Sequence, residues 1–253
     1  EFQSVLIFDN ALLGRVLILD DVVQTTARDE FIYHEMLAHV PLFSLDAPRE
    51  VLIIGGGDGG CLEEVLKHPV DRVTMIELDR QVVDLAQAHL GMICGAAFDD
   101  PRTELRIEDG AKFLAETNRR FDLIIIDSTD PIGPGVVLFN PEFYANCRRC
   151  LLPTGILATQ NGVPFIQAEE LTASATAFKD LFKYPRFCFA AVPTYMGGVM
   201  AFGCASDSTD AGAIPLETLR ARQQQLALDL SYYSAEVHLG AFAMPPYLQA
   251  LMP

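Results

Sequence analysis

A glycine-rich segment with a single acid in its middle is the first candidate for chemistry: Gly55-Gly56-Gly57-Asp58-Gly59-Gly60. It satisfies the G-x-G-x-x-G pattern of dinucleotide-binding loops, and an acid, Glu77, follows about 20 residues on. In such loops backbone N–H groups bind a pyrophosphate, and the Asp58 carboxylate would oppose that anion. The segment therefore predicts a site for a nucleoside with a positively charged tail. The alternative is a glycine turn in which Asp58 is merely solvated.

Two further acidic positions come where predicted strands end. Glu77 follows a strand over residues 72–76, and its carboxylate can accept hydrogen bonds from both hydroxyls of a ribose. Asp109 and Gly110 follow a strand over residues 104–107 and are placed to meet the edge of an adenine. Each acid alone would more often be a helix cap. Together with the glycine loop, they predict an adenosine site.

A third loop places two carboxylates three residues apart: Asp127-Ser128-Thr129-Asp130-Pro131-Ile132-Gly133-Pro134. It follows the most apolar predicted strand, and its prolines stiffen it. Two carboxylates held this way favour cation binding and proton acceptance. The alternative is an Asx-turn formed by Asp130 before Pro131.

Alternating strands and helices from residue 50 onwards must position these residues. The apolar runs are continuous, which is typical of parallel strands buried on both faces. We expect a Rossmann-like, doubly wound, mostly parallel α/β sheet of the methyltransferase kind, with ligands outside the carboxyl ends of its strands. The predicted strands are residues 51–54, 72–76, 104–107, 121–126 and 155–159, and the helices between them are residues 61–68, 79–90, 110–117 and 141–150.

The flanking segments predict a smaller unit in front of this sheet and a mixed tail behind it. Apolar runs at residues 5–8 and 16–19 indicate a β-hairpin, which alone is marginal in water. We expect residues 1–27 to be a partial β-strand unit that pairs with another chain or lacks its beginning, and residues 28–253 to be the catalytic domain. Outside the sheet we predict helices over residues 29–43, 167–182, 215–228 and 234–250 and strands over residues 187–192 and 198–204.

The charge balance favours a cationic partner. Lys and Arg number 18 against 34 Asp and Glu, which gives a net charge of −16. Nucleic acid is not expected, because a phosphate backbone needs clustered basic residues and those of this chain are scattered. A cationic substrate would be attracted, although acidity also serves simply to keep a protein soluble.

Composition argues against several other classes. No apolar stretch approaches the roughly 20 residues that span a bilayer, so no membrane partner is expected. Six cysteines in 253 residues do not form a disulfide framework, which indicates a reducing, cytoplasmic location. No metal site is expected, because Cys147 and Cys150 supply only two ligands and the spacing of His34 and His39 is one residue too long for an HExxH motif. The start lacks an initiator Met and a leader pattern, so we expect upstream residues to be missing.

In combination, these segments resemble the polyamine aminopropyltransferases, specifically the spermidine synthase family. The matching segments occur in order along nearly the whole chain, and the N-terminal β unit is shorter than in the family. The matches are Val23-Gln24-Thr25, Asp29-Glu30, Tyr33-His34-Glu35, the glycine loop, Glu77-Leu78-Asp79, Asp109-Gly110, the loop from Asp127 to Pro134, Gln160-Asn161-Gly162-Val163 and Pro193-Thr194-Tyr195.

The family makes spermidine and methylthioadenosine from putrescine and decarboxylated S-adenosylmethionine. The resemblance therefore implies these two small-molecule partners, no additional cofactor, and a homodimer or homotetramer. It implies that Asp127 is the catalytic base, assisted by Tyr33. The implied nucleoside-binding residues are Gln3, His34, Asp58, Glu77, Asp109, Gly110 and Pro134, and the implied amine-binding residues are Gln24, Tyr33, His34, Asp58, Asp127, Asp130 and Tyr195.

Three alternatives remain at this point: a transferase for another di- or polyamine, an S-adenosylmethionine-dependent methyltransferase, and a catalytically silent binding protein. Asp58 argues against the methyltransferase. Decarboxylation leaves a bare aminopropyl cation, which an acid can bind, whereas a methyltransferase must also accommodate a carboxylate. Asp127 and Tyr33 together argue against a silent binding protein.

Overall fold

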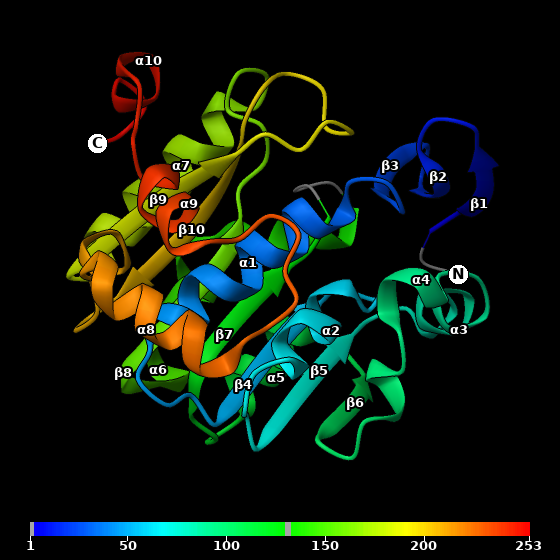
Figure 1. The fold of residues 1–253 in the computed structure, drawn as a ribbon, viewed down its shortest axis with the longest axis horizontal. Helices are drawn as coiled ribbons and strands as arrows, with labels where there is room; N and C mark the ends of the chain where they lie inside the picture. The colour runs from blue at the N-terminus through cyan, green and yellow to red at the C-terminus, as the bar shows by residue number, and fades with distance from the viewer. Residues whose placement is uncertain (1–2, 130–132) are drawn as a thin grey trace.

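The computed structural model describes residues 3–129 and 133–253, and within them the chain forms one large mixed sheet and one small antiparallel sheet (Figure 1). The large sheet has the order β6-β5-β4-β7-β8-β10-β9. Its first five strands are parallel, and β10 is antiparallel to both of its neighbours. The predicted Rossmann-like, mostly parallel fold is confirmed. The strands are β4 (Glu50–Gly55), β5 (Arg72–Glu77), β6 (Thr103–Ile107), β7 (Phe121–Asp127), β8 (Leu151–Gln160), β9 (Tyr184–Ala190) and β10 (Met200–Ser206).

Helices cover both faces of the large sheet (Figure 1). One face packs against α1, α2, α8 and α9, and the other packs against α5, α6, α7 and α10. None of the described helices combines the length and apolar character needed to cross a bilayer. The helices are α1 (Glu30–Ser44), α2 (Gly60–Leu66), α3 (Arg80–His89), α4 (Gly91–Cys94), α5 (Gly110–Glu116), α6 (Pro141–Cys150), α7 (Ala168–Leu181), α8 (Leu216–Leu226), α9 (Ala235–Ala241) and α10 (Pro246–Gln249), with short 3-10 turns η1 (Ala97–Asp99), η2 (Gly133–Phe139) and η3 (Ala211–Ala213).

Strand β4 shows why the central strands are apolar throughout. Val51 and Ile53 point into the core under α1 and α2, whereas Leu52 and Ile54 point into the core under α5 and α6. All four are at most 3% exposed, and burying each such side chain contributes about 1.5–3 kcal/mol. This burial fixes the register of β4 against β7, in which Gly55 lies beside Asp127. The glycine loop and the acidic loop therefore leave the sheet side by side.

The N-terminal segment forms a three-stranded antiparallel sheet, one strand more than the predicted hairpin. Its strands are β1 (Val5–Asn10), β2 (Gly14–Leu19) and β3 (Val22–Thr26). Leu17 and Leu19 of β2 pack against apolar residues of α3 and α4. Figure 1 shows the small sheet on the same side of the molecule as these two helices. The small sheet therefore lies against one side of the larger α/β unit.

The predicted helix over residues 234–250 is wrong as a single helix. The structure has two short helices, α9 and α10, separated by an irregular turn before Pro245 and Pro246. Proline lacks the backbone donor that a helix interior needs, so the second helix restarts with Pro246 at its first position.

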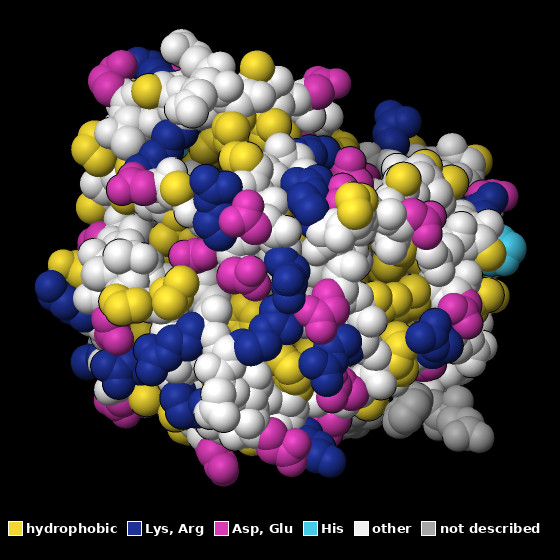
Figure 2. All heavy atoms as spheres, turned by 90° about the horizontal axis from the view of Figure 1, so that it is seen from below, with side chains coloured by type: hydrophobic (Ala, Val, Ile, Leu, Met, Phe, Trp, Pro, Cys, Tyr) yellow, Lys and Arg dark blue, Asp and Glu magenta, His cyan; other side chains and the backbone are white. Residues whose placement is uncertain are grey.

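The face at the amino ends of the parallel strands carries mixed charge. Figure 2, which views the molecule from below Figure 1, shows Lys and Arg interspersed with Asp and Glu over this face. Arg119, for example, pairs with Glu50 at the start of β4 and with Glu104 in β6. Both of these acids are therefore paired with a basic group.

Candidate active site

A cavity of about 820 Å³ opens at the carboxyl ends of the parallel strands. It lies where the glycine loop, the loops after β5, β6 and β7, the start of α1 and the small N-terminal sheet meet. The predicted site residues that line it are Gln3, Gln24, Tyr33, His34, Asp58, Glu77, Asp109, Gly110, Asp127 and Tyr195. The structure therefore brings together residues from 3 to 195 in one cavity, at the edge of the sheet that the sequence predicted.

Two predicted site residues, Asp130 and Pro134, cannot be placed relative to the cavity in the same way. Asp130 lies outside the described residues. Pro134 belongs to η2, and its contact with a nucleoside stays a prediction.

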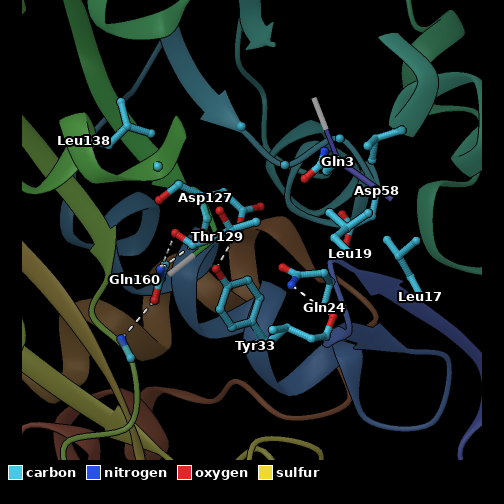
Figure 3. A pocket seen from close by; sticks show the side chains of 18 of the residues that line it. Gln3, Leu17, Leu19, Gln24, Tyr33, Asp58, Asp127, Thr129, Leu138 and Gln160 are labelled. Carbon is cyan, nitrogen blue, oxygen red and sulfur yellow. Dashed lines mark hydrogen bonds between the residues drawn. The ribbon is translucent and has the colours of Figure 1, made fainter. Parts of the chain in front are cut away.

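Asp127 is the last residue of β7 and lies at the centre of the cavity (Figure 3). Its Oδ2 atom is buried and has no hydrogen-bond partner among the described residues. A Cβ atom at Gly56 would lie 2.8 Å from this oxygen, so only glycine allows the loop to approach so closely. Burial raises the pKa of Asp127 to about 6, and the charge of Asp58 adds to the rise. The carboxyl group is therefore a stronger base than an ordinary Asp.

Tyr33 of α1 points its hydroxyl at Asp127 (Figure 3). The hydroxyl donates a 2.6 Å hydrogen bond to Oδ1. Burial, followed by the charge of Asp127, raises the pKa of Tyr33 well above 10.0. The Tyr33 hydroxyl therefore stays protonated and acts as a fixed donor, leaving the other carboxylate oxygen facing the cavity.

Asp58 and His34 form a second polar group at the glycine loop. The Asp58 Oδ1 atom accepts a 3.0 Å hydrogen bond from the N–H of Gly60, and Oδ2 lies 3.5 Å from His34 Nε2. One ligand atom each from His34, Asp58 and Asp127 lie within 4.8 Å of one another. Two carboxylates therefore face the cavity beside the glycine loop, where a cation would be attracted.

Glu77 ends β5 in a buried position that faces the glycine loop. Its Oε1 atom accepts a 2.9 Å hydrogen bond from the N–H of Asp79, while Oε2 lies close to Gly57. Burial raises the pKa of Glu77 to about 7, although the N–H groups of Asp79 and Leu78 favour its charged form. The carboxylate is held in one orientation at the rim that the sequence assigns to a ribose.

The neighbouring positions complete this side of the cavity. Asp109 caps α5, because its Oδ1 atom accepts hydrogen bonds from the N–H groups of Ala111 and Lys112. Asp109 is thus a helix cap that also lines the cavity, and its contact with an adenine stays a prediction. Gln3 reaches over from the N-terminal segment, with Nε2 3.5 Å from Asp79 Oδ2.

The other side of the cavity is closed by a contact between Tyr195 and the small sheet. The Tyr195 hydroxyl donates a 2.5 Å hydrogen bond to the carbonyl oxygen of Gln24 in β3. The ring of Tyr195 meets that of Tyr33 edge to face at 5.9 Å. The two predicted amine-pocket residues Gln24 and Tyr195 are therefore bonded directly, through the Gln24 backbone.

Sequence reasoning missed the role of Asp29, which ties these two segments together. Its buried carboxylate accepts hydrogen bonds from the Thr26 hydroxyl and from both the N–H and the hydroxyl of Thr194. Because Thr194 precedes Tyr195, Asp29 holds the loop that carries Tyr195 against β3. The available signal in the sequence was the position of Asp29 just before α1, and an acid at that position usually indicates no more than a helix start.

Gln160 is a second residue whose role the sequence did not reveal. It ends β8, and its Nε2 atom donates to the carbonyl oxygens of Ser128 and Thr129 (Figure 3). Its Oε1 atom accepts a hydrogen bond from the N–H of Gly162. Gln160 thus links the first residues of the acidic loop to the next strand. Its position at the carboxyl end of a predicted strand was the available signal.

A Rossmann-like fold with an acidic cavity at the carboxyl edge of its sheet defines a class of proteins that bind small molecules at the ends of their strands. Comparison with known proteins narrows this class. A family model described as the spermine/spermidine synthase domain matches residues 30–213, and one described as the spermidine synthase tetramerisation domain matches residues 1–27.

Relatives and solved structures agree with these family models. Polyamine aminopropyltransferase 1 of Pseudomonas aeruginosa is 55% identical over 253 residues, which cover 99% of this chain and 88% of that protein. The polyamine aminopropyltransferase of a Ruegeria species is 53% identical over 254 residues, covering 100% and 89%. A crystal structure of spermidine synthase in complex with the transition state analogue AdoDATO superposes with a TM-score of 0.94 at 37% identity, covering 100% of this chain and 85% of that one. The crystal structure of the spermidine synthase from Thermotoga maritima superposes with a TM-score of 0.91 at 35% identity, covering 100% of this chain and 84% of that one.

The chain therefore belongs to the spermine/spermidine synthase family and is a transferase of the polyamine aminopropyltransferase type.

Proposed function

We propose that the protein is a spermidine synthase, which transfers the aminopropyl group of decarboxylated S-adenosylmethionine to putrescine. The observation that carries this proposal is the state of Asp127. One oxygen is held by the Tyr33 hydroxyl, and the other is buried in the cavity with no hydrogen-bond partner among the described residues. An ammonium group is a suitable partner for such an oxygen, because it supplies three donors and a positive charge.

The donor would occupy the side of the cavity under the glycine loop. Glu77 is oriented to accept the ribose hydroxyls, and Asp109 with Gly110 lines the place for the adenine. Asp58 faces the aminopropyl ammonium, with His34 behind it. Gln3 and Pro134 complete the proposed set, as the family resemblance implies.

The acceptor would lie between Tyr33 and the closed end formed by Gln24 and Tyr195. Asp127 binds the attacking amino group there, and Asp130 is proposed from the family resemblance to bind along the same diamine. The acidic character of the cavity suits a substrate that carries a positive charge at each end.

The attacking amine must lose a proton before it can react. An amine with a pKa of about 10 costs about 4 kcal/mol to deprotonate at pH 7. The pKa of an ordinary carboxyl group lies about 6 units below the pKa of that amine, and this gap opposes proton transfer. The pKa of Asp127, at about 6, reduces the gap. The positive charge of the sulfonium, close to the amine in the closed site, lowers the pKa of the amine and reduces it further.

The transfer step then needs mainly positioning. The nitrogen lone pair attacks the methylene carbon beside sulfur, the new N–C bond forms, and the C–S bond breaks with its electron pair going to sulfur. Methylthioadenosine leaves as a neutral thioether, and the product nitrogen carries the positive charge that the sulfur has lost. Asp127 holds the proton that the amine gave up before the attack. Because a sulfonium is already a good leaving group, we propose that no further cofactor takes part. Tyr33 and Asp127 accelerate the step by holding nitrogen in line with carbon.

Incubation with decarboxylated S-adenosylmethionine and a panel of amines, followed by mass spectrometry of the products, tests the proposal. We expect spermidine and methylthioadenosine to form from putrescine. The kcat/KM for putrescine should be higher than that for cadaverine or spermidine as the acceptor. Each methylene contributes about 1 kcal/mol to such discrimination. If another amine gave a higher kcat/KM than putrescine, that amine would be the preferred acceptor and the proposed one would be wrong. Methylated products from intact S-adenosylmethionine would contradict the proposal.

We further propose that the small N-terminal sheet mediates assembly into a homodimer or homotetramer. Leu6, Phe8, Leu12 and Val22 expose large apolar side chains on it, and the segment matches a tetramerisation domain. Light scattering after size-exclusion chromatography should give a multiple of 27.8 kDa, and a monomer at micromolar concentration would contradict this.

All six cysteines are free and buried, which supports a reducing compartment, and we propose the cytoplasm.

A further inference from the structure

We propose that Glu30 is a positioning residue, which acts through the ring of His34 to hold the Asp58 carboxylate in the cavity. The three side chains form a line that begins outside the proposed substrate contacts and ends at the glycine loop. The proposal rests on the proposed function only in assigning the aminopropyl ammonium of the donor to Asp58.

The geometry places a carboxylate at each nitrogen of the His34 ring. Glu30 and His34 are one helical turn apart in α1, with Glu30 Oε2 2.7 Å from Nδ1. Asp58 Oδ2 lies 3.5 Å from Nε2. A neutral imidazole donates from one nitrogen only, whereas imidazolium donates from both. Two acceptors on opposite sides of the ring therefore favour the imidazolium form.

The ring has little freedom to turn away from this arrangement. His34 is 1% exposed, and its ring meets that of Tyr33 edge to face at 5.2 Å. On the opposite element, a Cβ atom at Gly60 would lie 2.3 Å from His34 Cε1. The glycine at this position thus makes room for the ring directly under the loop that carries Asp58.

The charged and titratable groups around the ring favour its protonation. Glu30 lies on α1, Asp58 on the glycine loop and Asp127 at the end of β7, while Glu63 on α2 interacts electrostatically with Glu30. Burial lowers the pKa of His34, but Asp58 and then Glu30 outweigh this and raise it well above 6.5. The ring therefore carries a positive charge at neutral pH.

This charge has a consequence for Asp58. The carboxylate accepts a hydrogen bond from the Gly60 N–H on one oxygen and pairs with the His34 ring at 3.5 Å on the other, and these two contacts orient it in the cavity. This ion pair depends on the charge of the ring, because a neutral imidazole no longer attracts the carboxylate as a cation. Replacing Glu30 by Gln keeps a hydrogen-bonding group next to Nδ1 and removes the negative charge that favours the imidazolium.

The first test measures the ring directly, by NMR of the full-length protein with ¹⁵N-labelled histidine. We expect the His34 signals, assigned by their loss in His34→Gln, to show both nitrogens protonated at pH 7 in the wild type. In Glu30→Gln the midpoint should fall by at least about 1 pH unit. In Glu30→Asp, which keeps the charge at a greater distance, the midpoint should fall less. Glu63→Gln is the matched control and should change it least. A neutral ring at pH 7 in the wild type, or an unchanged midpoint in Glu30→Gln, would overturn the proposal.

The second test measures binding of the decarboxylated donor by calorimetry without an acceptor. At a pH between the His34 midpoints that the titration gives for Glu30→Gln and for the wild type, Glu30→Gln should raise the donor Kd about 5- to 10-fold relative to wild type, because Asp58 loses its charged partner. The ratio should shrink towards 1 at a pH below the midpoint of the variant, where its ring is protonated again. Binding of methylthioadenosine, which has no ammonium group, should stay within about twofold of wild type. A pH-independent ratio, or an equal loss for both ligands, would show a merely structural role.

The two proposals fail in different ways. If the wild type forms no spermidine, the proposed function is wrong, while the histidine titration still decides whether Glu30 controls the ring. If spermidine forms but the titration is unaffected by Glu30→Gln, the function stands and the positioning role is wrong.

Discussion

Replacing Tyr33 by Phe removes only the hydroxyl that donates to Asp127, and it should shift the pH dependence of the reaction. The hydrogen bond is 2.6 Å long, its acceptor is charged, and its donation lowers the pKa of Asp127. Hydrogen bonds to charged groups contribute about 1.5–3 kcal/mol, and 1.36 kcal/mol corresponds to one pH unit. The pKa of Asp127, at about 6 in the wild type, should therefore rise by about 1 to 2 pH units in Tyr33→Phe.

The direction of the effect follows from the role of the carboxylate. Asp127 accepts a proton only when it is ionised, so activity is lost as the pH falls through its pKa. With a pKa near 6 about three quarters of the wild type is ionised at pH 6.5, against about a tenth of a variant with a pKa of about 7.5. We expect kcat/KM for putrescine to be about eightfold lower in Tyr33→Phe than in wild type at pH 6.5 from ionisation alone, and this factor should approach 1 above pH 9.

The assay is release of methylthioadenosine, followed by liquid chromatography from pH 5 to pH 9. The ratio of wild type to variant cancels the titration of the amine itself, which both enzymes share. Tyr144→Phe is a matched control, because its hydroxyl bonds to Ser174 in the core on the opposite face of the sheet. A wild-type to variant ratio for Tyr33→Phe that stays constant across this range would refute the proposed link between the hydroxyl and the basicity of Asp127.

Two further substitutions separate the donor and acceptor sides of the cavity. Asp58→Asn should reduce the preference for decarboxylated over intact S-adenosylmethionine about tenfold, because it removes the charge that repels the carboxylate; competition binding measures this, and an unchanged ratio would contradict it. Asp29→Asn should raise KM for putrescine about tenfold and KM for the donor about twofold or less, because it loosens Thr194 and thus Tyr195. Steady-state kinetics decide, and equal increases in both KM values would argue against a specific effect on the acceptor pocket.

The sheet and its active edge were predictable because they depend on local pattern. Continuous apolar runs such as residues 51–54 and 121–126 can be buried on both faces only within a covered parallel sheet. Once the strands are parallel, the residues after them must meet at one edge. This is why Asp58, Glu77 and Asp127, which lie far apart in the chain, were predicted to share a site.

The remaining features depend on where distant segments pack, which no local pattern specifies. Asp29 and Thr194 are 165 positions apart, and their contact requires the loop after β9 to meet the start of α1. The bond of Gln160 to the loop after Asp127 depends on the order of neighbouring strands, which pattern alone did not provide. The third strand, β3, was missed because Val22–Thr26 is short and half polar. Glu30 reads locally as an ordinary first-turn acid of α1, because only the folded structure places its helical neighbour His34 against Asp58.

The single-turnover rate of spermidine formation in Asp127→Asn tests the central claim most directly. Asn preserves the shape of the side chain and its contact with Tyr33, but it cannot take the proton from the amine. We expect binding of methylthioadenosine and the thermal unfolding midpoint to stay close to wild type, while the rate falls by about 10²- to 10⁴-fold. A rate within a few-fold of wild type would show that Asp127 is not the base.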